Sequence, residues 1–230
     1  MATAGKKYSA LTQAMVTSAL VAGIDEGSYE ELLAYLDGTV RSYEEGSLLV
    51  RIGDAQARVG MVVEGDIEVG FYDESGSLAN VTRMRPGDVF AESIACAGVP
   101  SPVQALASED STVLWLSADR IRRAGSFGAP RSAGCMLGNL VGLLSRKNVF
   151  LNRKVHILAQ KRLRDRVKLY LNDCTSGSGQ QRASFSRSEL ARYLCVDRSA
   201  LSRELGRMRD EGIVRLDGKD ITVVDVSFLK

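Results

Sequence analysis

The chain has 230 residues, of which 45% are hydrophobic and 25% are charged, with 22 glycines and four prolines. This composition is globular and large enough for two modest cores, and no apolar run reaches the ~18 residues of a membrane span. Charge is unevenly distributed, because residues 1–144 have a balance of −7 whereas residues 145–230 have 19 Lys and Arg against 10 Asp and Glu. The basic C-terminal part predicts an anionic partner.

Cysteine and histidine usage argues against a metal centre. Cys96, Cys135, Cys174 and Cys195 lie far apart in the sequence, and His156 is the sole histidine. Neither a zinc site nor an iron–sulfur cluster has ligands at such spacing. Scattered cysteines are typical of reduced thiols in the cytoplasm. We therefore expect a cytoplasmic protein that contains no metal and does not bind a membrane.

Helical and extended patterns alternate along the first half of the chain. Residues 10–37 have the pattern and composition of a helix that ends near Asp37-Gly38. From Val40 to Leu116, short runs rich in Val, Ile, Phe and Tyr are separated by turn sequences such as Gly65-Asp66 and Ser75-Gly76. Many short strands at this spacing predict an antiparallel sandwich or a small barrel.

A long apolar stripe follows in the next helical segment. Its members alternate at spacings of four and three residues, which is the a/d pattern of a coiled coil: Leu137, Val141, Leu144, Asn148, Leu151, Val155 and Leu158. One such stripe can simply pack on its own domain. Because this one is sustained, we interpret it as the seam of a dimerisation helix, with a polar residue at one seam position that fixes the register.

The C-terminal unit predicts two short helices and a hairpin. A helix over about 163–172 and the polar loop "TSGSGQQRA" precede it. Ser186 and Glu189 have the spacing of a capping box at the first helix, and Asp197 is a good N-cap for the second. The second helix is predicted to have a buried stripe formed by Leu201, Leu205 and Met208. It is expected to end at Gly212, and Asp217-Gly218 predicts the turn of a following hairpin.

A helix–turn–helix followed by a hairpin is the winged form of a DNA-reading unit. Arginines at the start of the second helix can bind phosphate, and one a turn later can reach a guanine edge. The predicted DNA-binding residues are Ser186, Arg187, Arg198, Ser199, Ser202, Arg203 and Arg207. A structural helix pair with a charged solvent face is the alternative, but it does not explain the cap, the break and the wing together.

Four stretches, in order, resemble the Crp/Fnr family of bacterial transcription regulators: "RSYEEGSLLVRIGD", "VVEGDIEVGFYDESG", "RPGDVFAES" and "RSALSRELGRMRDEGIV". The resemblance implies an α+β fold with an N-terminal antiparallel double-stranded β-roll of jelly-roll type, a long dimerisation helix and a C-terminal winged helix–turn–helix. The corresponding domains are residues 1–128, 129–160 and 161–230. It also implies a homodimer on a palindromic operator in double-stranded DNA, and RNA polymerase as a partner if the protein is an activator.

The effector region departs from the family members that bind cyclic nucleotides. Those members have a Gly-Glu pair, a short helix and then an Arg-Ser pair that holds the cyclic phosphate. Here Glu92 is present, but no Arg or Lys occurs between Arg85 and Arg120, and Pro100 and Pro102 remove two N–H donors. The cysteine cluster of the oxygen-sensing branch and the axial histidine of the haem branch are also missing. The sequence therefore argues against cyclic AMP, haem and an iron–sulfur cluster.

Several alternatives stay open. The predicted effector pocket is formed by Glu92, Ser93, Val103, Lys147, Asn148, Leu151 and Asn152. It could take a small, partly apolar ligand, or it could be collapsed and bind nothing. Ser199 stands where many members have an acidic residue, so the operator is expected to differ from the cyclic-AMP type. A β-roll sensor module without an active ligand pocket, and a ligand-independent or thiol-responsive regulator, are the other readings. We do not expect an enzyme, because a cupin-type site needs histidines on the strands.

Overall fold

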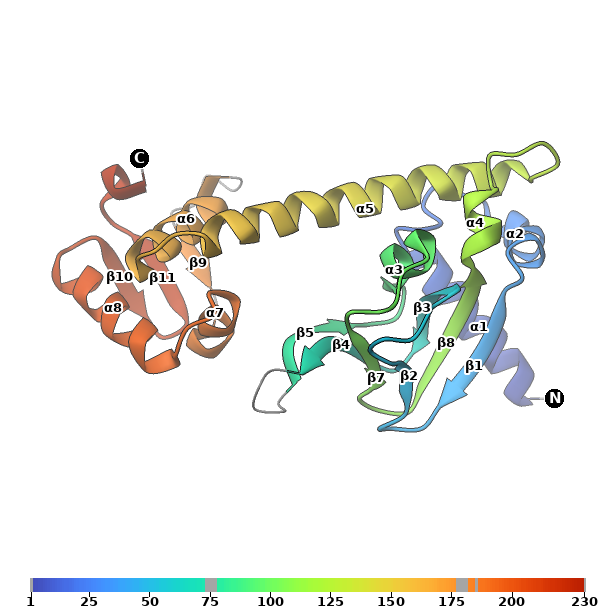
Figure 1. Ribbon diagram of the computed structural model, residues 1–230, viewed down its shortest axis with the longest axis horizontal. Coiled ribbons are helices and arrows are strands. Elements are labelled where there is room, and N and C mark those ends of the chain that lie inside the picture. Colours follow the sequence, from blue (N-terminus) through green and yellow to red (C-terminus); the bar gives the residue numbers. More distant parts are fainter. Residues whose placement is uncertain (1, 73–77, 177–181, 185, 230) are drawn as a thin grey trace. The chain divides into compact units, whose positions relative to one another are not determined.

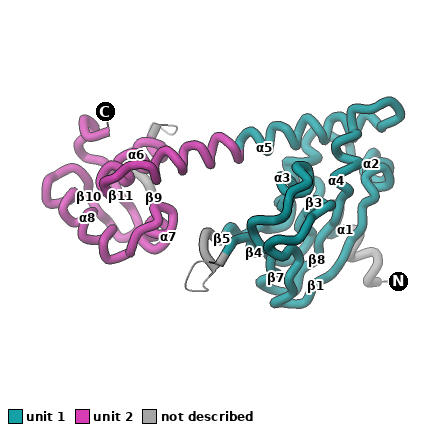
Figure 2. The backbone as a smooth tube through the Cα atoms, viewed as in Figure 1, with its two compact units in different colours: residues 1–146 teal, residues 147–230 magenta. Residues whose placement is uncertain are grey.

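The computed structural model describes residues 2–72, 78–176, 182–184 and 186–229. The chain forms two compact units, Met1–Arg146 (unit 1) and Lys147–Lys230 (unit 2) (Figures 1 and 2). Helix α5 (Arg131–Leu158) contributes residues to both units. The two units correspond to the acidic and the basic halves of the sequence.

Unit 1 contains two four-stranded antiparallel sheets, with the strand orders β1-β8-β3-β6 and β2-β7-β4-β5. The strands are β1 (Thr39–Tyr43), β2 (Leu48–Val50), β3 (Arg58–Glu64), β4 (Ile67–Tyr72), β5 (Leu78–Met84), β6 (Val89–Phe90), β7 (Gln104–Ala107) and β8 (Ser111–Ser117). Gly65-Asp66 lies at the turn from β3 to β4, which belong to different sheets. The Ser75-Gly76 turn lies outside the described residues. The predicted antiparallel double-sheet architecture is confirmed.

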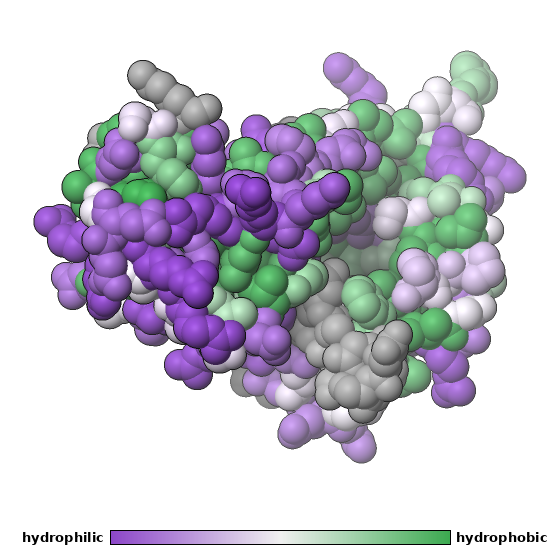
Figure 3. Space-filling model, turned by 60° about the vertical axis from the view of Figure 1, so that its left-hand side comes forward, coloured by the Kyte–Doolittle hydropathy of each residue, from purple (hydrophilic) through white to green (hydrophobic). Residues whose placement is uncertain are grey.

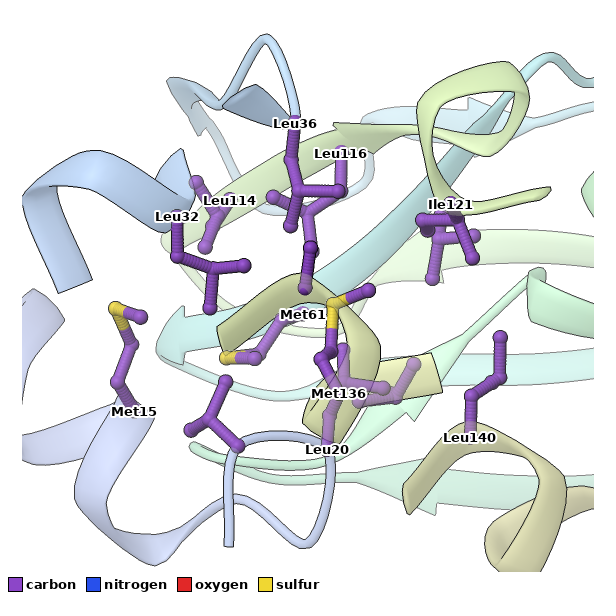
Figure 4. Close-up of a cluster of buried hydrophobic side chains, with 14 of the residues drawn as sticks. Met15, Leu20, Leu32, Leu36, Met61, Leu114, Leu116, Ile121, Met136 and Leu140 are labelled. Atoms are coloured by element: carbon purple, nitrogen blue, oxygen red, sulfur yellow. The ribbon is translucent and has the colours of Figure 1, made fainter. Parts of the chain in front are cut away.

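Helices cover one face of the first sheet and form the larger core of unit 1 (Figure 4). They are α1 (Ala2–Thr17), α2 (Tyr29–Tyr35), α4 (Ala118–Arg122) and the first turns of α5; the short 3-10 helix η1 (Glu26–Ser28), directly before α2, has no buried residue. Met15, Leu32, Met61 and Met136 bring helix and strand side chains together in this core. Because β3 is buried on both faces, its sequence is a continuous apolar run rather than an alternation. The single helix expected over residues 10–37 is wrong, since turns between α1 and η1 interrupt it.

Unit 2 is a small helical domain with a three-stranded sheet in the order β10-β11-β9. Its other elements are α6 (Leu163–Ser176), β9 (Arg182–Ser184), α7 (Arg187–Tyr193), α8 (Arg198–Asp210), β10 (Val214–Asp217), β11 (Asp220–Val223) and the 3-10 helix η2 (Val226–Leu229). Apolar side chains of α6, α7, α8, β10, β11 and η2 form one core with Ile157 from the end of α5. The predicted hairpin is present, with Gly218 at φ +59° in its two-residue loop.

The predicted α+β class, with its long helix and its C-terminal helix–turn–helix and hairpin, is confirmed. Two boundaries differ from the expectation: α6 extends to Ser176, and part of the predicted loop "TSGSGQQRA" forms strand β9. The middle of that loop, residues 177–181, lies outside the described residues. Within the described part of the chain, no helix is both long and apolar enough to cross a membrane.

Candidate DNA interface and effector region

Helix α7 begins with a capping box between a serine and a glutamate. The backbone N–H of Glu189 donates to Ser186 Oγ at 3.1 Å, and the N–H of Ser186 donates to Glu189 Oε2 at 3.0 Å, which completes the predicted capping box. These bonds to Ser186 hold the pKa of Glu189 below its usual value. The hydroxyl of Ser186, a predicted DNA-binding residue, therefore caps the N-terminus of α7 in this structure.

The turn after α7 is a Schellman motif. Val196 N–H donates to Ala191 O at 3.0 Å and Cys195 N–H donates to Arg192 O at 3.3 Å. Cys195 takes the left-handed conformation, φ +53°, that glycine ordinarily occupies at this position. Asp197 has the backbone of an N-cap, as predicted, but its side chain makes no capping hydrogen bond to α8.

Helix α8 has one buried and one exposed face. Leu201, Leu205 and Met208 are fully buried in the core of unit 2. Arg203 lies about half a turn from this stripe and is exposed, as is Ser199 one turn before it. Gly212, at φ +74°, ends the helix as expected. The helix thus presents to solvent the positions from which side chains can reach the edges of bases.

The other predicted DNA-binding residues lie on α8 and at the start of α7. Arg198 and Arg207 are exposed, and Ser202 and Arg187 are half-buried. Hydrophilic side chains predominate over unit 2 on the face that Figure 3 shows. A groove-sized helix with arginines at its N-terminus and along its exposed face has the chemistry of a recognition helix.

In unit 1, three predicted effector residues lie near the short helix α3 (Glu92–Ala97). Glu92 is the first residue of α3 and is only 3% exposed. Ser93 is exposed and Val103 is half-buried. Ala91 takes the left-handed conformation, φ +60°, directly before Glu92. The family pattern has glycine at this position, and the backbone of this chain keeps the conformation that glycine favours.

The segment after α3 uses its backbone donors internally. Ser101, 2% exposed, donates its N–H to Asp54 O at 2.9 Å and accepts from Gly53 N–H through its own carbonyl at 2.8 Å. Its hydroxyl accepts from Val103 N–H at 3.3 Å. Gly98 N–H closes α3 on Ile94 O. With prolines at 100 and 102, the N–H groups of residues 98 and 100–103 are all either absent or engaged.

Aromatic side chains fill the space between the two sheets. Phe90 and Trp115 pack edge to face, with ring centroids 5.4 Å apart, and Trp115 Nε1 donates to Tyr43 Oη at 2.9 Å. Phe90 lies directly on Gly60, where a Cβ would come within 2.4 Å of the ring. Sequence reasoning missed this contact, because nothing local to Gly60 indicates which side chain covers it.

The remaining predicted effector residues lie on the part of α5 that belongs to unit 2. Asn152 Nδ2 donates to Asn148 Oδ1 at 2.8 Å, one turn apart, and both side chains are exposed. Leu151 is exposed and Lys147 is half-buried. The structure therefore places the predicted pocket residues in two different units, and their meeting in one pocket stays a prediction.

The predicted seam residues differ in burial along α5. Leu137 and Leu144 pack partly against the core of unit 1. Three other members of the stripe are more than half exposed: Val141 at 57%, Leu151 at 55% and Val155 at 65%. These three residues lie within about a quarter turn of one another around the helix. Leu158 is half-buried at the end of the helix. The role of this stripe as a dimer seam stays a prediction.

We also considered a metal site and a reactive thiol at Cys96 among the described residues. Among the described residues, no group of three or more His, Cys, Asp or Glu side chains could hold a metal ion. Burial raises the pKa of the half-buried Cys96 thiol, which lowers its thiolate fraction at neutral pH and so its reactivity. This environment is typical of a packed cysteine rather than of a thiol sensor.

Two family sequence models match the chain in the order of its two units. The cyclic nucleotide-binding domain family matches residues 40–125, and the Crp-like helix-turn-helix domain family matches residues 162–230. No curated protein sequence matched the chain. Together the two models account for the β-roll and for the DNA-reading unit.

Several solved structures share the fold along most of the chain. The catabolite activator protein of Thermus thermophilus is 23% identical, with 92% of this chain and 96% of that chain covered and a TM-score of 0.57. The c-di-GMP responsive regulator CLP of Xanthomonas campestris is 20% identical, with 88% and 100% covered and a TM-score of 0.57. CprK complexed with OCPA is 19% identical, with 86% and 92% covered and a TM-score of 0.63.

Proposed function

The chain belongs to the Crp/Fnr family of DNA-binding transcription regulators, and from this premise we propose that it acts as a cytoplasmic homodimer on a palindromic operator, under the control of a small effector other than cyclic AMP. The observation that carries the DNA-binding mode is the exposed face of α8, with Ser199 and Arg203 opposite a fully buried stripe. A second copy would bring a second α8 to the next half-site. RNA polymerase is a further partner if the protein is an activator.

Replacing Arg203 with alanine is expected to weaken binding to a selected operator by about 1–3 kcal/mol per half-site and to relax base preference at one position. The reason is that a guanidinium can donate two hydrogen bonds to one guanine edge. The operator is obtained by selecting duplex DNA from a random-sequence library with the wild-type protein. Affinity is then measured by fluorescence anisotropy at several salt concentrations.

Arg209→Ala is the matched control for this experiment. It removes the same charge from the same helix, but Arg209 lies about a third of a turn from Arg203 and pairs with Asp210 at 2.8 Å. We expect a smaller loss that is similar for all DNA sequences. If selection with the wild-type protein enriches no sequence, or if Arg203→Ala binds the operator as the wild type does, this mode of DNA recognition is wrong.

Cyclic AMP is expected to leave both the thermal stability and the operator affinity unchanged at millimolar concentration. The support is chemical: residues 86–119 contain no Lys or Arg, and the N–H groups of residues 98 and 100–103 are absent or engaged. A ligand selective for the folded protein would raise its melting temperature, so a thermal-shift titration measures this directly. A saturable rise that Glu92→Ala abolishes would contradict the proposal.

The same assay separates a working pocket from a collapsed one. The solved structures with this fold include a protein described as c-di-GMP responsive and one complexed with OCPA, so effectors of different chemistry are compatible with the architecture. A metabolite that raises the melting temperature and loses its effect in Glu92→Ala or Asn148→Leu would locate the pocket. Silence across a broad library would favour a regulator without an active ligand pocket.

A further inference from the structure

Arg164, near the start of α6, binds two carboxylates on the side of α8. Its Nε donates to Glu204 Oε1 at 2.6 Å, while Nη1 and Nη2 donate to the two oxygens of Glu211 at 2.6 and 2.8 Å. Glu204 and Glu211 are seven residues apart, which places them two turns apart on one side of the helix. A single guanidinium therefore binds both carboxylates, one of them in a bidentate pair, and offsets one of their two negative charges.

These carboxylates lie beside the predicted DNA face. Glu204 directly follows Arg203 in the sequence, and its side chain is only 12% exposed. Its second oxygen, Oε2, is 3.6 Å from Nη1 of Arg207, whose side chain is 70% exposed. By helical periodicity, Arg207 lies between the side of α8 that carries Glu204 and the side that carries Arg203. Glu204 and a DNA phosphate are thus alternative partners for Arg207.

We propose that Arg164 is a positioning residue for DNA recognition: by binding Glu204 and Glu211 from α6, it keeps Arg207 available for a backbone phosphate. The inference rests on the proposed function. Without Arg164, the largely buried carboxylate of Glu204 loses its closest cation, and Arg207 is drawn to it. The carboxylate of Glu211 loses the cation that offsets its negative charge at the same time. Both changes oppose the approach of phosphate.

The test compares Arg164→Ala with the double variant Arg164→Ala, Glu204→Gln in the full-length protein. The probe is the duplex DNA selected by the wild-type protein. Arg164→Ala is expected to lower the affinity on the order of tenfold, and to reduce the slope of log affinity against log salt by about 1 per subunit, as for one lost phosphate contact. Glu204→Gln in the same background is expected to restore the affinity to within about threefold of the wild type.

A purely structural role for Arg164 predicts a different result. The link from α6 to α8 is absent from both variants, so thermal unfolding followed by calorimetry should show both to be less stable than the wild type. If DNA affinity follows stability and the double variant stays as weak as Arg164→Ala, the positioning role is overturned. It is also overturned if Arg164→Ala binds DNA as tightly as the wild type.

Arg207→Ala supplies a second, independent comparison. If Arg164 acts through Arg207, removing Arg164 from an Arg207→Ala protein should cost less affinity than removing it from the wild type. Equal losses in the two backgrounds would overturn the inference while leaving the proposed function intact. A wild-type protein that selects no DNA would instead overturn the proposed function, and this inference with it.

Discussion

Gly60→Ala is expected to lower the free energy of unfolding of unit 1 by about 3 kcal/mol, because one methyl group overpacks the space between the two sheets. A Cβ at this position would lie 2.4, 2.6 and 2.9 Å from three carbons of the Phe90 ring. That ring is fully buried and packs against Trp115, so it cannot move aside without disturbing a second ring.

Urea unfolding followed by the fluorescence of Trp115 measures this effect. Trp115 is the sole tryptophan of the chain and contacts Phe90, so its signal reports on unit 1 and not on unit 2. Gly138→Ala is the matched control, since Gly138 lies within α5 and a Cβ there meets nothing within 4 Å. Alanine in a helix interior should stabilise by up to about 1 kcal/mol.

A compensating change at Phe90 provides a further check. Phe90→Leu should be less harmful in the Gly60→Ala background than in the wild type, because the smaller side chain leaves room for the new methyl group. Strictly additive losses would mean that the two residues do not compete for the same space. In the chain, Phe90 is followed by Ala91 and then by Glu92, the first residue of α3 and a residue of the predicted effector pocket.

The C-terminal unit could be predicted well because its determinants are local. The Ser186–Glu189 capping box, the glycine at 212 and the two-residue turn at Gly218 each act over a few residues. The stripe on α8 follows from helical periodicity alone. Strand β9 was missed because three residues gain a strand conformation only by pairing with β11, about 40 residues further on. No local pattern carries that information.

The candidate DNA interface and the effector region also differ in how far local sequence determines them. The exposed arginines of α8 could be identified from their spacing, whereas Arg164 looked like any charged residue of a helix until its contacts with Glu204 and Glu211 were seen. The absence of Lys and Arg from residues 86–119 was visible in the sequence, but the approach of Arg122 to α3, where its Nη1 donates to Ala95 O at 3.2 Å, was not. The engagement of the Ser101 N–H by Asp54 O was not visible either, because the two residues meet only when the loops fold together.

Introducing glutamate at both Leu151 and Val155 is expected to convert the proposed dimer into a monomer at micromolar concentration, with a loss of at least about 100-fold in dimer affinity. Both side chains are more than half exposed in the single chain and lie on the same side of α5 as Val141. Two-fold symmetry would bring each introduced charge close to its own copy. Both charges would then be desolvated without a partner, at a cost of several kcal/mol.

Sedimentation velocity over a range of concentrations checks this expectation, and operator affinity gives a second readout. A monomer binds one half-site only and loses the gain in effective concentration that a linked second site provides. Arg153→Glu is the control, because it adds negative charge to an exposed position about half a turn from the stripe. A double variant that still sediments as a dimer would show that the stripe is not the seam. Because Leu151 and Val155 are exposed in the single chain while Leu137 and Leu144 pack partly on unit 1, the C-terminal part of the stripe is where a partner subunit would stabilise α5 most.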